Sequence, residues 1–477
     1  MQFIRYSLFV LLVIFPFSAQ AAYDSDFMKG YNFPAWWHNA YLQKTSDESF
    51  NNLVRDGGPT WIAVGTFWYQ KSKSATEIYE NKKRTANDVN VEHVIQMAHE
   101  KGLKVMLKPS VDAEGGDWRG TFTPSDVDAW FKSYTAMAVH YADMAERFKV
   151  EAYEFAGEYV TLSGAQNADR WRAVVRAVRE KYKGQIGYGA NWDGQKGTPE
   201  FALVNWWDAV DFIGIHAYFP IAETNDATLD AMVRGWTNIV WQKKQRNWIA
   251  EVNAVHEKYK KPVIFTEAGY KSCDGSTRIP WWCNPKAKAD LQEQSDGAEA
   301  ILKAFQDKPW LKGIFWWLWT IEPNGYKTAK EHDLNKKPAL AVIRKYWGAA
   351  PSTQTNQRPP LLVGEGRGEV TKKIDLFYNK PQLSAKEEER WGKKMWNGIR
   401  KSFKNRQPKL KPGEWTKARL AFTYGGYPID VIREALHYRV SKKYPTPYWL
   451  LPQRKTCDSP KTCGIHPTIP WNQWKRS

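Results

Sequence analysis

The sequence predicts an α/β protein: a (β/α)8 TIM barrel followed by a smaller, basic and mostly helical C-terminal region. Apolar, β-rich runs alternate with segments whose apolar residues recur every three to four positions, as alternating βα units require. Eight such runs occur before residue 320, the number that a closed parallel barrel needs. The 477 residues are enough for a barrel and a second region.

Each predicted strand is an apolar run that ends at a change of composition. In chain order the strands are Gly30–Trp37, Trp61–Trp68, Leu103–Pro109, Glu151–Ala156, Gln185–Asn191, Val210–Tyr218, Pro262–Thr266 and Gly313–Trp319. The predicted helices are Val89–Lys101, Pro124–Phe148, Asn167–Tyr182, Leu229–Tyr259 and Asp290–Asp307. Ser125, which follows a proline, is the expected start of the second helix.

The first 21 residues have the parts of a secretory signal peptide. Arg5 provides the positive start, Leu8–Phe17 the short apolar core, and Ala19-Gln-Ala21 a cleavage site. An uncleaved membrane anchor is the alternative, but this apolar run is short for a bilayer. We therefore expect a secreted or periplasmic protein with no membrane span in the mature chain.

The four cysteines form two close pairs in the sequence, Cys273 with Cys283 and Cys457 with Cys463. Even pairs at short spacing in an exported chain indicate disulfides that hold loops. A metal site is the competing interpretation, but no histidine or further cysteine clusters near either pair. We expect two disulfides and no metal ligands.

Charge divides the chain into two parts. Residues 351–477 hold 26 Lys and Arg against 10 Asp and Glu, a net charge of +16, whereas residues 21–350 hold 42 against 41. We therefore expect a barrel over 22–348, a linker over 349–360 and a basic, aromatic-rich region over 361–477. Such a charge excess favours binding of an acidic glycan or another polyanion, with a merely solvated basic surface as the alternative.

Two glutamates end predicted strands: Glu158 follows the fourth and Glu267 the seventh. Catalytic side chains of a (β/α)8 barrel project from the C-terminal ends of its strands. Two carboxyls about 5 to 5.5 Å apart cleave a glycosidic bond with retention, one as acid/base and one as nucleophile. We assign these roles to Glu158 and Glu267, and this chemistry requires no cofactor. The alternative is that both are ordinary surface glutamates.

Further residues at strand ends are candidates for holding a sugar. Tyr218 can hydrogen-bond the nucleophile, and His216 points to the same face, although a structural role for His216 is equally open. Apolar sugar faces stack on aromatic rings, and alternation places Trp317 and Trp319 on one face of the last strand. The candidate substrate contacts are Trp37, Asp112, Trp118, Arg119, Asn191, Trp192, His216, Tyr218, Trp317 and Trp319.

Segments from five predicted strands together resemble glycoside hydrolase family 113. They are Tyr31–Trp37, Lys108–Asp112 with Trp118–Gly120, Gly189–Asp193, Phe265–Tyr270 and Gly313–Trp319. The resemblance covers residues 24–347 and implies a barrel that cleaves β-mannan with retention, with Glu158 as acid/base and Glu267 as nucleophile. One departure is Gly157, because related enzymes often carry at this position an asparagine that contacts the sugar 2-hydroxyl.

These observations predict an exported retaining glycoside hydrolase acting on a β-linked polysaccharide, with a mannan as the first candidate. The alternative is an envelope protein whose barrel binds glycans or polyanions without cleaving them.

Overall fold

The computed structural model describes residues 23–325, 330–348, 423–424 and 427–428. The chain divides into two compact units, Met1–Thr355 and Asn356–Ser477. The predicted signal peptide, the linker and the predicted pair Cys457 and Cys463 lie outside the described residues. Within the second unit the described residues are β13 (Thr423–Tyr424) and β14 (Tyr427–Pro428), which pair antiparallel.

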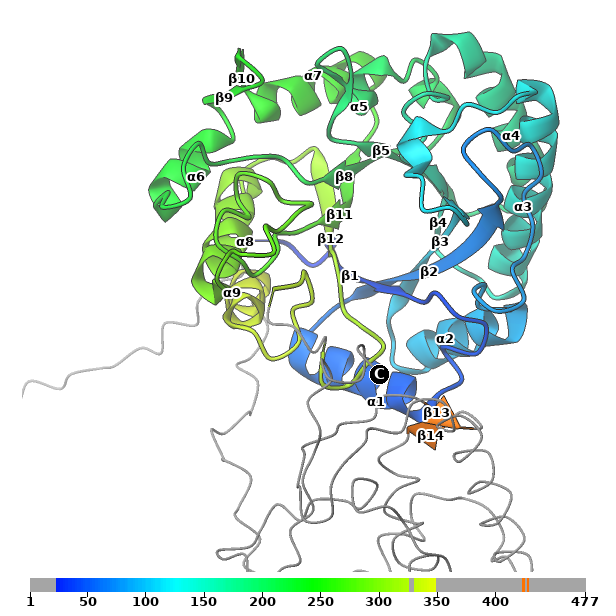
Figure 1. Ribbon diagram of the computed structural model, residues 1–477, viewed down its shortest axis with the longest axis horizontal. Coiled ribbons are helices and arrows are strands. Elements are labelled where there is room, and N and C mark those ends of the chain that lie inside the picture. Colours follow the sequence, from blue (N-terminus) through cyan, green and yellow to red (C-terminus); the bar gives the residue numbers. More distant parts are fainter. Residues whose placement is uncertain (1–22, 326–329, 349–422, 425–426, 429–477) are drawn as a thin grey trace, which may run out of the picture. The chain divides into compact units, whose positions relative to one another are not determined.

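Eight parallel strands close into a barrel, which confirms the predicted (β/α)8 fold (Figure 1). They pair in the order β1-β2-β3-β4-β5-β8-β11-β12 and back to β1. Their bounds are β1 Met28–Pro34, β2 Trp61–Gln70, β3 Lys104–Ala113, β4 Ala152–Gly157, β5 Gln185–Asn191, β8 Phe212–Ala217, β11 Val263–Ala268 and β12 Leu311–Trp316. Each predicted strand overlaps one of these, so the apolar runs did locate the barrel.

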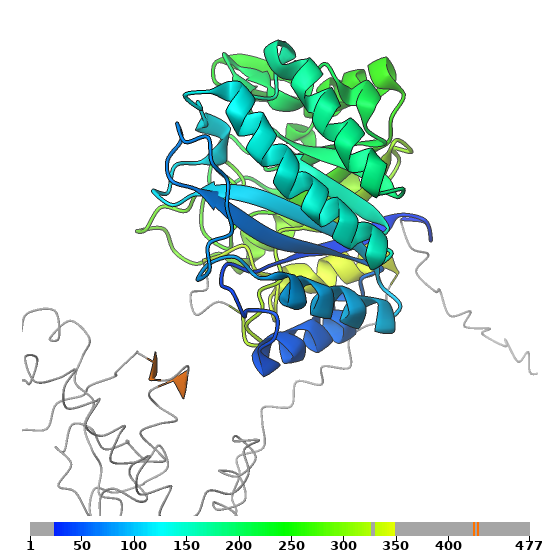
Figure 2. The same ribbon diagram turned by 90° about the vertical axis from the view of Figure 1, so that its right-hand side faces the viewer.

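Helices cover the outer face of the barrel (Figure 2). They are α1 Lys44–Asn52, α2 Asp88–Glu100, α3 Val127–Arg147, α4 Ala168–Lys181, α5 Glu200–Leu203, α6 Leu229–Gly235, α7 Trp248–Tyr259, α8 Leu291–Phe305 and α9 Pro338–Trp347. The prediction that Ser125 starts α3 is wrong, because the cap is Asp126, whose carboxylate accepts the backbone N–H of Ala129. In the described part of the chain, no helix is long and apolar enough to cross a membrane.

The predicted single helix Leu229–Tyr259 is also wrong. Between α6 and α7 the chain forms a hairpin of β9 (Ile239–Trp241) and β10 (Lys244–Arg246). Its two turn residues, Gln242 and Lys243, have φ of 50° and 62°, as a tight two-residue turn requires. A second short hairpin, β6 (Gly194–Gln195) with β7 (Thr198–Pro199), follows β5.

The barrel interior changes from apolar to charged along the strands. Seven buried residues form the apolar cluster, namely Trp61, Ala63, Met106, Ala152, Phe212, Ile264 and Phe315. Because side chains of a strand alternate between faces, two residues beyond Met106 and Ala152 come Lys108 and Glu154, again facing inward. The charged part of the interior therefore lies toward the C-terminal ends of the strands, where a barrel carries its active site.

Candidate active site

Glu158 directly follows β4 and has an unusual backbone conformation. Its φ of 63° lies in the left-handed region, which a residue with a side chain seldom adopts. Two hydrogen bonds hold this turn: Glu158 N–H donates to Gly189 O (2.9 Å), and the next N–H, of Tyr159, donates to the Tyr188 hydroxyl (3.0 Å). Backbone strain of this kind concentrates at functional sites, and here it aims a carboxyl at the barrel mouth.

Three side chains surround the Glu158 carboxyl. Asn191, the last residue of β5, donates to Oε1 at 2.8 Å, and His216 Nδ1 lies 3.2 Å from the same oxygen. The indole N–H of Trp118 donates to Oε2 at 3.4 Å. Three of the predicted substrate contacts thus adjoin the predicted acid/base.

Glu267 lies near the end of β11, and both of its oxygens have partners. The predicted hydrogen bond from the Tyr218 hydroxyl is present, to Oε2 at 2.7 Å. Lys108 Nζ donates to Oε1 at 3.1 Å, and His216 Nε2 lies 3.5 Å from that oxygen. Glu158 follows β4 and Glu267 lies in β11, yet their carboxyls contact opposite nitrogens of the His216 imidazole.

His216 is therefore the centre of the site, and its side chain is only 2% exposed. Burial alone opposes a charge on the ring, but the carboxylates of Glu267 and Glu158, together with Glu154 at 3.2 Å, raise the pKa of His216 to about 10. The imidazole is thus a buried cation between carboxylates.

The same cation acts on Glu158, whose side chain is 14% exposed. Burial by itself raises the pKa of this carboxyl, but His216, Arg119 and the Asn191 hydrogen bond outweigh burial and lower the pKa to about 2. Arg119 is held in place by Asp112, which it contacts at 2.6 Å. Asp112 and Arg119, both predicted substrate contacts, thus form an ion pair beside Glu158.

The sequence alone did not indicate two charged residues and an amide that lie beneath the site, namely Lys108, Glu154 and Asn32. Lys108 Nζ contacts Asn32 Oδ1 (3.1 Å), Thr266 O (3.1 Å) and Glu154 Oε1 (3.2 Å), in addition to Glu267. The alternation of strand residues was the available signal, because Glu154 interrupts an otherwise apolar strand. A charged residue on the inner face of a barrel needs a partner there.

A second buried glutamate, Glu200 at the start of α5, supports the site from behind and was also missed. Its carboxyl accepts the Asn191 backbone N–H at 2.6 Å and the Tyr188 hydroxyl at 2.5 Å. Tyr188 in turn accepts the N–H of the residue after Glu158. Burial raises the pKa of Glu200 to about 7. Nothing in its local sequence distinguishes it, because only the fold brings α5 against β5.

Two glycines leave space for the charged side chains of the site. A Cβ on Gly189 would lie 2.5 Å from His216 Nε2 and 2.6 Å from Glu154 Oε1, so a side chain there would displace the charged cluster. A Cβ on Gly157 would lie 3.0 Å from Gly189 O and 3.2 Å from His216 Cε1. An asparagine at position 157 would therefore require its neighbours to move.

The predicted aromatic contacts have different environments. Trp37 and Trp118 are exposed, and Trp317 is half-buried and meets Trp36 edge-on at 6.3 Å. Trp192 is 4% exposed. Trp319 is completely buried, with its indole N–H bonded to Ser49, so the structure gives it no surface for a sugar. The alternation argument failed because β12 ends at Trp316.

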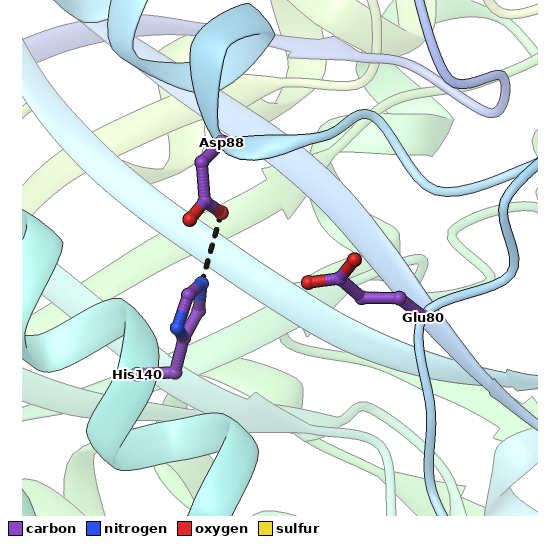
Figure 3. Close-up of side chains that lie close together, drawn as sticks. All are labelled: Glu80, Asp88 and His140. Atoms are coloured by element: carbon purple, nitrogen blue, oxygen red, sulfur yellow. Dashed lines mark hydrogen bonds and ion pairs between the residues drawn. The ribbon is translucent and has the colours of Figure 1, made fainter.

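The predicted disulfide between Cys273 and Cys283 is present. In the described residues, one group of side chains, Glu80, Asp88 and His140, places ligand atoms within 4.8 Å of one another (Figure 3). His140 Nε2 lies 2.9 Å from Asp88 Oδ1, and this bond raises the pKa of His140. Protonation competes with metal binding, so this bond favours an ion pair between His140 and Asp88.

The barrel and the two strand-end glutamates that meet at one histidine define a glycoside hydrolase of the (β/α)8 type. Residues 31–336 match the model of Glycoside Hydrolase Family 113, and the chain belongs to this family.

Solved structures of family members are similar to the chain. A family 113 β-1,4-mannanase, described as a complex, is 25% identical, with a TM-score of 0.59 over 68% of this chain and all of that one. The β-mannanase of Alicyclobacillus acidocaldarius is 27% identical, with a TM-score of 0.58 over 68% of this chain and 99% of that one. Comparison with curated proteins gave no match.

Proposed function

We propose that this enzyme cleaves β-1,4-linked mannan with retention of the anomeric configuration, using Glu158 as acid/base and Glu267 as nucleophile. The observation that carries the proposal is the convergence of both carboxyls on His216. The similar family 113 structures, which are β-1,4-mannanases by description, support the choice of sugar.

In the first step an oxygen of Glu267 bonds to the anomeric carbon, and the bond from that carbon to the leaving sugar oxygen breaks. The leaving oxygen takes a proton from Glu158. In the free site Glu158 has a pKa of about 2, so binding of the sugar must raise this pKa before Glu158 can act as the acid.

In the second step Glu158, now a carboxylate, takes a proton from water as the water oxygen bonds to the anomeric carbon. The ester bond to Glu267 breaks, and the sugar leaves with its original configuration after two inversions. The carboxylate of Glu267 is restored, and Glu158 holds the proton taken from water for the next cycle. The Tyr218 hydroxyl holds Glu267 in position throughout.

The first test uses an aryl β-mannoside. Glu267→Gln should lower turnover by about three orders of magnitude or more, because no glycosyl-enzyme forms. Glu158→Ala should be rescued by azide, which attacks without a general base.

The proton NMR spectrum of the first product should show the β-anomer, and an initial α-anomer would rule out the double displacement. Unchanged rates in both variants would favour a barrel that binds glycans only.

We further propose that the chain is exported and that residues 361–477 bind acidic glycans or other polyanions. The composition of residues 1–21 and the +16 charge of residues 351–477 support this. N-terminal sequencing of the protein from the medium or periplasm should begin at residue 22. The full chain should be retained on dextran sulfate and released by moderate salt, whereas equal retention on neutral dextran would contradict the electrostatic basis.

A further inference from the structure

The loop closed by the Cys273–Cys283 disulfide carries two exposed tryptophans side by side in sequence. Trp281 is 44% exposed and Trp282 is 50% exposed. A large aromatic ring gains by burial, so an exposed ring that other side chains hold in place is a candidate for a binding role. The disulfide restrains this loop at both ends.

Trp281 is part of a supported aromatic stack. Its ring lies on that of Trp192 with centroids 5.0 Å apart and an angle of 26° between planes. Trp241, at the end of β9, packs edge-on against both rings, at 5.7 Å from Trp192 and 6.0 Å from Trp281. Trp192 itself is buried against Trp248, at 6.0 Å. One side of the Trp281 ring is therefore braced, while much of the ring remains accessible to solvent.

Contacts connect the stack to the acid/base. Trp192 directly follows Asn191, whose amide donates to Glu158 at 2.8 Å. The stack therefore begins one residue from a group that touches a catalytic carboxyl.

Other contacts connect the same loop to the nucleophile. His332 Nε2 lies 2.9 Å from the carbonyl oxygen of Pro280, the residue before Trp281. The His332 ring meets that of Tyr218 at 5.6 Å, and Tyr218 donates to Glu267. Burial lowers the pKa of His332 to about 3, so a neutral ring donates through Nε2. Contacts through intermediate side chains thus connect the loop to both members of the catalytic pair.

We propose that Trp281, braced by Trp192 and Trp241, is a platform on which a sugar ring of the polysaccharide stacks, away from the bond that is cleaved. A planar ring with one braced face suits the apolar C–H face of a β-linked pyranose. The inference rests on the proposed function and extends it, because a platform outside the catalytic pair favours long chains over short ones. Trp282 provides a matched control, because no ring contact joins it to the stack among the described residues.

The experiment measures binding to the full chain carrying Glu267→Gln, which holds oligosaccharides without cleaving them. Calorimetry with β-1,4-mannohexaose and mannobiose should show that adding Trp281→Ala weakens hexaose binding about tenfold and biose binding less. Trp282→Ala should change either constant by less than about twofold. Trp281→Tyr should recover most of the hexaose affinity, which separates stacking from a folding defect.

Equal hexaose affinities for the parent and Trp281→Ala would overturn the platform while leaving the proposed hydrolysis intact. A chain that cleaves and binds cello-oligosaccharides instead would refute the choice of mannan, and the same comparison on cellohexaose would then decide the platform. A chain that neither binds nor cleaves either glycan would overturn both proposals.

Discussion

Replacing Lys108 by methionine tests the charged cluster under the active site. Lys108 is the shared cation of two carboxyls, with Nζ 3.1 Å from Glu267 and 3.2 Å from Glu154, and its side chain is 7% exposed. Burial opposes its charge, but the carboxylates outweigh burial and raise the pKa of Lys108. Methionine has a similar length and removes the charge, together with the hydrogen bonds to Asn32 and Thr266.

The expected loss follows from leaving the carboxylates of Glu154 and Glu267 with His216 as their remaining buried cation. Removing one partner of a buried ion pair costs about 3 to 5 kcal/mol, and we expect a loss within that range near neutral pH. Lys29→Met is the control. Lys29 is also buried, but its Nζ bonds to a carbonyl oxygen, Trp347 O, at 3.0 Å. Its replacement should cost about 1 to 2 kcal/mol.

The pH dependence of the unfolding free energy provides a second test of Lys108. Burial raises the pKa of Glu154, but Lys108 and His216 outweigh burial and lower it, so its ionisation contributes stability that is present above its unfolded pKa and lost as the pH falls. Without Lys108, burial should hold the pKa of Glu154 higher than in the parent protein. The difference in unfolding free energy between parent and Lys108→Met should therefore be largest near neutral pH and shrink toward about pH 5.

Urea denaturation at several pH values, followed by circular dichroism, measures both effects. A loss equal to that of Lys29→Met, or a difference that grows as the pH falls, would refute the assignment of Lys108 as the counterion of the buried carboxyls.

Two further changes test other parts of the site. Tyr218→Phe should lower kcat/KM on an aryl β-mannoside about tenfold or more, because the hydroxyl that positions Glu267 is lost; Tyr270→Phe, which loses only a bond to a carbonyl at 3.2 Å, should not. Glu200 has a pKa of about 7 in the fold against 4.5 unfolded, so its contribution to stability falls by about 3 kcal/mol as the pH rises from about 4.5 to 7. Glu200→Gln should remove that slope in denaturation curves, and an unchanged slope would contradict the buried carboxyl as its source.

Much of the barrel was predictable because its strands are buried on both faces. Such strands are continuous apolar runs, and their order along the chain is also the order around the barrel. Glu158 and Glu267 could be selected because each is a charged residue at the end of such an apolar run. Trp319 could not be judged from the same pattern, because alternation stops where β12 ends.

The hairpin of β9 and β10 was missed for a different reason. Helical periodicity continues across 229–259, but Gln242 and Lys243 adopt positive φ without a glycine to announce the turn. Pairing between Ile239–Trp241 and Lys244–Arg246 overrides the local preference.

The sequence by itself determined the barrel, its two catalytic candidates and the first disulfide, because these follow from local composition and spacing. Only the tertiary structure decided which groups of the site are charged, since closing the barrel brings Lys108, Glu154 and His216 from different strands to the carboxyls of Glu158 and Glu267. Charges in a buried space are set by their neighbours, and those neighbours are distant in the chain.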